Sequence, residues 1–67
     1  MYNDSMTLRE YIDQLGIRDA AMLFGVRPVT IYKWRTGERR PRPDLAWHIE
    51  RVTAGAVTMR EIYKAQP

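Results

Sequence analysis

The chain has 67 residues, no cysteine, and a formal net charge of +3 from 11 basic and 8 acidic residues. This length allows one small domain, residues 1–67, and the lack of cysteine excludes a disulfide framework and a thiolate metal site. No apolar run approaches the roughly 20 residues of a membrane span, and the polar N-terminus lacks the pattern of a secretory signal, so we expect a cytoplasmic location.

A first helix is predicted over residues 7–15, after residues 1–6, which we expect to form a flexible leader. Thr7 and Glu10 form a capping box, in which each side chain accepts a hydrogen bond from the backbone N–H of the other residue. Gly16 ends the helix. Apolar residues recur at helical spacing along one side, namely Leu8, Tyr11, Ile12 and Leu15. This stripe predicts a helix that packs against the rest of the domain.

Two further helices joined by a tight turn are predicted over about residues 18–24 and 28–35. Ala21 is small enough to let these helices approach closely, and Gly25 can adopt the positive φ that a sharp turn requires. Pro28 suits the first turn of the second helix, because N–H groups there have no intrahelical partner. Together these features predict a helix-turn-helix.

The second helix of this pair has a buried face and an exposed face. Ile31 and Trp34 lie three residues apart, so both point toward the preceding helix. We interpret Trp34 as a core residue rather than as one that stacks on a nucleic-acid base. The outward residues are basic, hydroxyl-bearing or apolar, and none is acidic: Arg27, Val29, Thr30, Tyr32, Lys33 and Thr36. Such a face suits a helix that lies in a groove of DNA.

The last third of the chain predicts two more helices. Residues 36–43 contain two prolines and are expected to form an exposed, arginine-rich loop. A helix over about residues 44–53 follows, with an apolar face formed by Leu45, Ile49 and Val52. Thr58 and Glu61 repeat the capping-box pattern at the start of residues 59–64, for which we expect a helix, with a strand as the alternative. The predicted fold class is therefore all-α, with five helices.

Basic residues are concentrated in one segment of the chain. Residues 27–42 carry a net charge of +5, whereas the remainder carries −2. A basic block on one helix and the loop that follows it creates a field that attracts polyanions. The alternative is an ordinary solvated basic face.

Enzymatic functions are not favoured by the composition. The chain has one histidine, His48, no cysteine, and no glycine-rich phosphate loop after a strand. The acidic residues are accounted for by helix caps and first turns. We therefore expect no catalytic residue, no metal ion, no cofactor and no small-molecule substrate.

Two stretches of the sequence resemble a known family. The run AAMLFGVRPVTIYKW at residues 20–34 is followed by a glycine and a basic loop, and IERVTAGAVTMREI follows at residues 49–62. This arrangement resembles the Cro-like repressors of temperate phages and their chromosomal relatives of the YdaS-like antitoxin branch, over about residues 7–63. The resemblance implies a lambda-repressor-like fold and an intracellular regulator that binds short DNA operators, usually as a dimer.

Carried over by position, the family's DNA contacts fall on two sets of residues. The base-contacting set is Arg27, Pro28, Val29, Thr30, Tyr32 and Lys33. The phosphate-contacting set is Arg35, Thr36, Arg39, Arg40 and Arg42. Many relatives carry glutamine or serine where this chain has Pro28 and Val29. In their place, Val29 is suited to a thymine methyl group, and Arg27 and Lys33 are suited to guanine.

A homodimer, either stable in solution or formed on the DNA, is expected because one short recognition helix buries little surface. Two-fold symmetry matches a pseudo-palindromic operator whose half-sites lie about 34 Å apart. The candidates for the dimer interface are Trp47, Met59 and Tyr63. Trp47 lies opposite the apolar face of its helix, so it is either exposed or packed beneath the C-terminal segment.

The sequence therefore predicts a repressor that binds double-stranded DNA and occludes a promoter, in a bacterial or phage-infected cell and without a membrane partner. The alternative is an antitoxin or adaptor that acts mainly through protein–protein contacts. The concentration of basic residues in residues 27–42 favours the repressor. So does the end of the chain at Pro67, because a toxin-binding extension would be longer.

Overall fold

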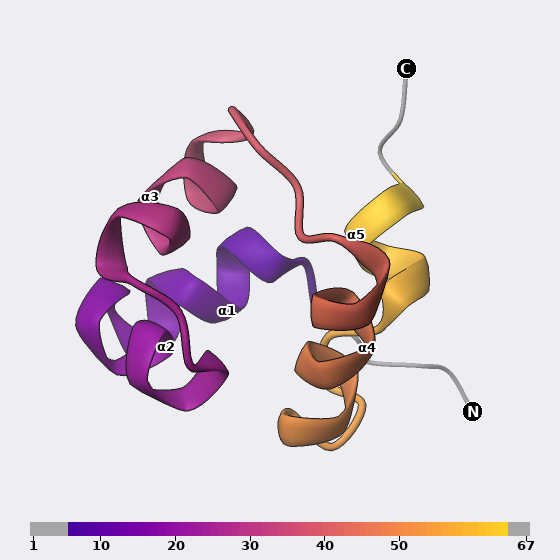
Figure 1. Ribbon diagram of the computed structural model, residues 1–67. Coiled ribbons are helices and arrows are strands. Elements are labelled where there is room, and N and C mark those ends of the chain that lie inside the picture. The colour runs from indigo at the N-terminus through magenta and orange to yellow at the C-terminus, as the bar shows by residue number, and fades with distance from the viewer. Residues whose placement is uncertain (1–5, 65–67) are drawn as a thin grey trace.

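Five helices make up most of residues 6–64, the part of the chain that the computed structural model describes. They are α1 (Leu8–Leu15), α2 (Ile17–Phe24), α3 (Pro28–Thr36), α4 (Pro43–Val52) and α5 (Met59–Lys64). No strand occurs among these residues, so the all-α prediction is confirmed and the last segment is a helix. In Figure 1, α2 and α3 lie on one side of the molecule, α4 and α5 on the other, and α1 between them.

The helices begin and end within one residue of their predicted bounds, and the predicted N-terminal capping residues Thr7 and Thr58 accept backbone hydrogen bonds. At α1, the Thr7 N–H donates to Glu10 Oε1 at 3.0 Å and the Glu10 N–H donates to Thr7 Oγ1 at 3.1 Å. Of the expected leader, residues 1–5 lie outside the described residues. Met6 is held in place, since its N–H donates to the Ala56 carbonyl at 2.8 Å.

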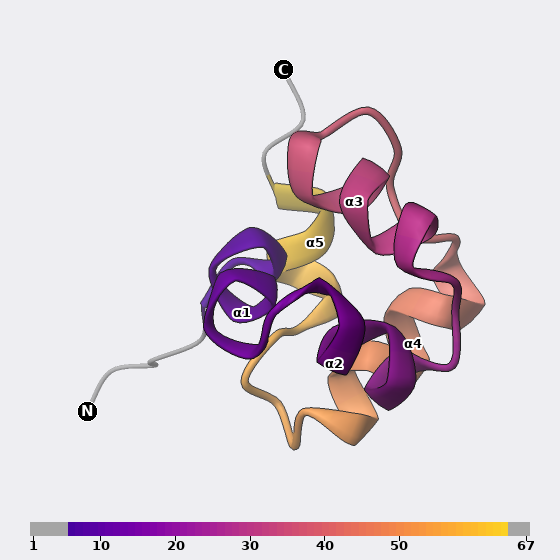
Figure 2. The same cartoon turned by 90° about the vertical axis from the view of Figure 1, so that its left-hand side faces the viewer.

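The core is formed by apolar side chains from all five helices. Its buried members are Leu8, Ile12, Ala20, Ala21, Phe24, Ile31, Trp34, Ala46, Ile49, Val57 and Ile62. Phe24 occupies the junction of the first three helices, with its ring centre 6.1 Å from that of Tyr11 and 6.5 Å from that of Trp34. Figure 2 looks onto the side of α2 and α3, with α4 and α5 behind them. The core therefore joins the α2–α3 pair to the C-terminal half.

The connection between α4 and α5 depends on one buried hydroxyl group. Thr53 is 7% exposed, and its Oγ1 donates to the Ile49 carbonyl at 2.8 Å. The same oxygen accepts the N–H of Val57 at 3.2 Å, and Val57 is fully buried. One side chain thus bonds polar backbone groups at both ends of the turn. The Ile49 carbonyl also accepts the Thr53 N–H at 3.0 Å, whereas the buried Val57 N–H relies on the hydroxyl group.

Replacing Thr53 with valine should lower the free energy of unfolding by about 1–3 kcal/mol, because the buried N–H of Val57 loses its acceptor. Valine keeps the shape of threonine, so packing changes little. Thr53→Ser is the control, because it keeps the hydroxyl group. Urea denaturation of the three proteins gives the comparison. Equal stability of Thr53→Val and the parent would show that the hydroxyl group does not organise this turn.

Candidate functional site

The corner between α2 and α3 is a tight turn built on glycine. Gly25 has φ 74° and ψ 32°, in the left-handed region that favours glycine. The Gly25 and Val26 N–H groups both donate to the Ala21 carbonyl, at 2.9 and 3.1 Å. Ala21 is buried, and Val26 packs against the core from the turn. This geometry fixes the direction in which α3 leaves the turn.

The rotation of α3 about its axis is set by two core residues. Ile31 is fully buried and Trp34 is 7% exposed, as predicted. On the opposite side, Val29 and Tyr32 are each 52% exposed, so each presents about half of its surface to solvent. Arg27, which caps α3, is also exposed. We call the exposed side of Arg27, Pro28, Val29 and Tyr32 the outer face of α3.

Two residues of the predicted base-contacting set do not belong to this outer face. Thr30 and Lys33 are half-buried and line a hollow between α3 and the start of α4, of about 340 Å³. Its full lining is Thr30, Lys33, Trp34, Arg39, Arg40, Arg42 and Leu45. We call it the α3–α4 hollow. The structure therefore divides the six predicted residues into an outer group of four and a group of two beside the arginines.

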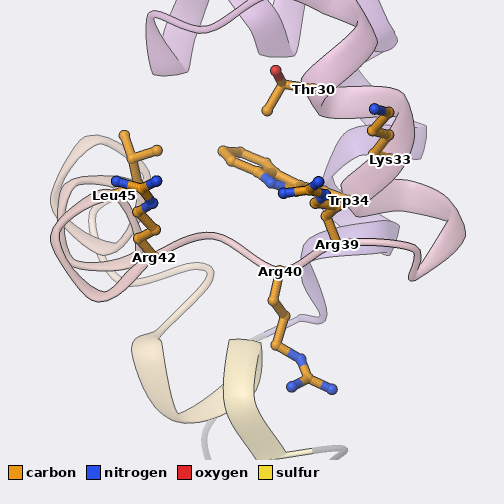
Figure 3. A pocket seen from close by; sticks show the side chains of 7 residues that line it. All are labelled: Thr30, Lys33, Trp34, Arg39, Arg40, Arg42 and Leu45. Carbon is orange, nitrogen blue, oxygen red and sulfur yellow. The ribbon is translucent and has the colours of Figure 1, made fainter.

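Figure 3 shows how the side chains of the α3–α4 hollow are arranged. The indole ring of Trp34 lies at the centre, with Thr30 on one side and Arg39 near its other end. Arg42 and Leu45 enter from the α4 side. The Arg40 side chain points away from the others. Cationic groups that gather around one concave surface attract anions, since their fields add there.

The loop that carries these arginines, residues 38–42, is held at both ends; we call it the arginine segment. At its start, the Arg39 N–H donates to the Lys33 carbonyl at 3.2 Å. Near its end, the Tyr63 hydroxyl donates to the Pro41 carbonyl at 2.7 Å, and Pro41 is buried. Arg39, Arg40 and Arg42 are exposed around this anchored backbone. The helix α5 thus helps to fix where the arginines emerge.

Two other members of the predicted phosphate-contacting set have partners within the chain. Arg35 Nε lies 2.6 Å from Oδ1 of Asp13 in α1, and the hydrogen bond and charge of Asp13 raise the pKa of Arg35. The Thr36 hydroxyl donates to the Lys33 carbonyl at 3.2 Å and accepts the Glu38 N–H at 3.4 Å. Both side chains therefore form bonds within the chain at the end of α3. The sequence pattern did not indicate these bonds.

The three candidates for a dimer interface lie in different environments. Trp47 is 54% exposed, and the Arg51 guanidinium lies 4.9 Å from the centre of its ring. Met59 and Tyr63 instead pack against the core, and the Met59 N–H donates to Glu50 Oε1 at 2.9 Å. The Tyr63 hydroxyl also donates its hydrogen bond to the Pro41 carbonyl in the arginine segment. Trp47 is thus the exposed aromatic residue of the three. The sequence analysis did not single out Met22 of α2, which is also a large apolar side chain exposed to solvent.

Comparisons with protein-family models, curated proteins and solved structures found no match to this chain. Within residues 6–64, no helix combines the length and the apolar character that a membrane span needs. In the same range, the His, Asp and Glu side chains form no group of three that could hold a metal ion. The charge and geometry of α3 and the arginine segment are therefore the basis for assigning a function.

Removing the Tyr63 hydroxyl group should loosen the arginine segment without disturbing the core. Tyr63→Phe keeps the ring and deletes the hydrogen bond to the Pro41 carbonyl. We therefore expect the free energy of unfolding to fall by about 1 kcal/mol. Hydrogen exchange at the Arg39 amide should become faster. Tyr32→Phe is the matched control, because that ring is half exposed on the outer face of α3. Unchanged Arg39 exchange in Tyr63→Phe would contradict the role of the tether.

Proposed function

We propose that the chain is a helix-turn-helix regulator that binds double-stranded DNA with α3 in the major groove. The proposal is carried by one observation, the gathering of cationic side chains in the α3–α4 hollow beside the exposed outer face of α3. Its lining residues include Lys33, Arg39, Arg40 and Arg42, of which Arg40 turns its side chain away from the others in Figure 3. Phosphates flank the major groove on both sides, so a groove-reading helix needs an adjacent cationic surface of this kind.

The two surfaces have separate tasks in this proposal. The outer face of α3 contacts base edges, because a major groove about 12 Å wide admits one α-helix. Lys33 and the arginine segment contact phosphates, which fix the register of the protein without reading sequence. Arg35 contributes indirectly through its ion pair with Asp13, which ties the last turn of α3 to α1. These assignments move Thr30 and Lys33 from the base-contacting to the phosphate-contacting group.

The finer proposal is a Cro-type repressor that acts in the cytoplasm of a bacterial or phage-infected cell. Two copies would bind a pseudo-palindromic operator with half-sites about 34 Å apart, and occupancy would occlude a promoter. A dimer is favoured because a single short helix contacts few base pairs. We propose that the exposed Trp47 contacts the second copy, since tryptophans that become buried on association contribute strongly to interfaces.

A second candidate, an adaptor or antitoxin that acts through protein contacts, is favoured by exposed apolar side chains on α2 and α4. Met22 is 81% exposed and Trp47 54% exposed, and large apolar side chains in solvent suit a protein partner. The exposure of these side chains is compatible with DNA binding, so the two candidates differ in whether the chain selects a DNA sequence.

The test is selection of bound duplexes from a random pool at physiological salt, followed by sequencing. We expect enrichment of an inverted repeat with half-sites one helical turn apart. Binding that is seen only at low salt, with no enriched sequence, would reflect charge alone and would overturn the proposed function in favour of a protein partner.

The selected duplex then separates the two surfaces quantitatively. Arg42→Ala should weaken selected and random duplexes about equally and reduce the slope of log affinity against log salt by about one. Arg27→Ala should weaken the selected duplex by roughly 1–3 kcal/mol more than a random one. Equal losses on both duplexes in Arg27→Ala would show that Arg27 does not read bases.

A further inference from the structure

The outer face of α3 is unusually apolar for a surface that contacts bases. Val29 and Tyr32, one turn apart, are each 52% exposed, and Pro28 precedes them. The Pro28 and Val29 side chains can neither donate nor accept a hydrogen bond, and Pro28 also lacks a backbone N–H. Hydrogen-bond reading from this face is therefore left to Arg27 and the Tyr32 hydroxyl group.

The other two polar residues of the predicted base-contacting set lie at the edge of the outer face. Thr30 and Lys33 are half-buried and line the α3–α4 hollow, which Arg39 and Arg42 also line. Lys33, which the sequence suggested for guanine, is thus grouped with the cationic side chains that suit phosphates.

One apolar group is available in the major groove of DNA. The C5 methyl of thymine is the apolar feature of the base edges, and it marks A·T pairs. Resting on the proposed function, we propose that the outer face of α3 selects its half-site by enclosing thymine methyl groups between Val29 and Tyr32. Charge complementarity favours DNA as the occupant, since cationic residues that suit phosphates line the adjacent hollow.

The test replaces thymine with deoxyuridine, one position at a time, in the duplex obtained by selection. This change removes one methyl group and leaves Watson–Crick pairing intact. At one or two positions in each half-site, binding should weaken about fourfold, as expected for the loss of one buried methyl group. Replacement in both half-sites should weaken binding by roughly the square of that factor.

A variant comparison assigns the effect to the proposed residues. In Val29→Ala, the preference for thymine over deoxyuridine at the sensitive position should fall to about one, because the enclosing methyl groups are gone. Met22→Ala is the matched control, because Met22 is an exposed apolar residue on α2. It should keep the full preference. Val29 is half exposed, so its replacement leaves the core intact.

The outcomes separate this inference from the proposed function. If the protein prefers its selected duplex but tolerates deoxyuridine at every position, methyl recognition is wrong and the repressor proposal stands. Preservation of the thymine preference in Val29→Ala would also overturn the inference. If selection enriches no sequence, both proposals fail.

Discussion

The burial of Ile31 and Trp34 is the constraint on which the rest of the site depends. These two side chains fix the rotation of α3, because both must face the core formed with Phe24 and its neighbours. Protein interiors are closely packed, so rotation of α3 about its axis would open a cavity in the core. This rotation determines which side chains of α3 face solvent, including the exposed Val29 and Tyr32.

A second constraint converts a loop into a defined surface. Loops of this length have considerable conformational freedom, and long arginine side chains add more. Here the Lys33 carbonyl and the Tyr63 hydroxyl hold the backbone of residues 38–42 at two points. The arginines are thereby presented from a fixed backbone, which reduces the entropy lost when an anion binds. The C-terminal helix α5 thus supports the proposed interface from outside it.

Local signals in the sequence predicted the fold well. Capping residues such as Thr7, the turn glycine Gly25 and the spacing of apolar residues act over three or four positions, and the helices begin and end close to where these signals place them. The site was predicted less completely. The Asp13–Arg35 pair and the Tyr63–Pro41 bond each join residues 22 apart, so they depend on how the helices pack.

The sequence pattern also did not predict that the exposed residues of α3 divide between an outer face and the α3–α4 hollow. Helical spacing indicated that Thr30 and Lys33 point away from the core, which is correct. It did not indicate that α4 and the arginine segment would form a hollow around them. Long-range placement of a loop therefore changed which residues we assign to bases and which to phosphates.

The central claim is that the outer face of α3 and the arginine segment bind DNA as one surface. Titration of the ¹⁵N-labelled protein with its selected duplex, followed by amide chemical shifts, tests it most directly. The largest changes should fall in the first two turns of α3 and in residues 38–42. Changes confined to the surroundings of Met22 and Trp47, with α3 unaffected, would contradict the claim.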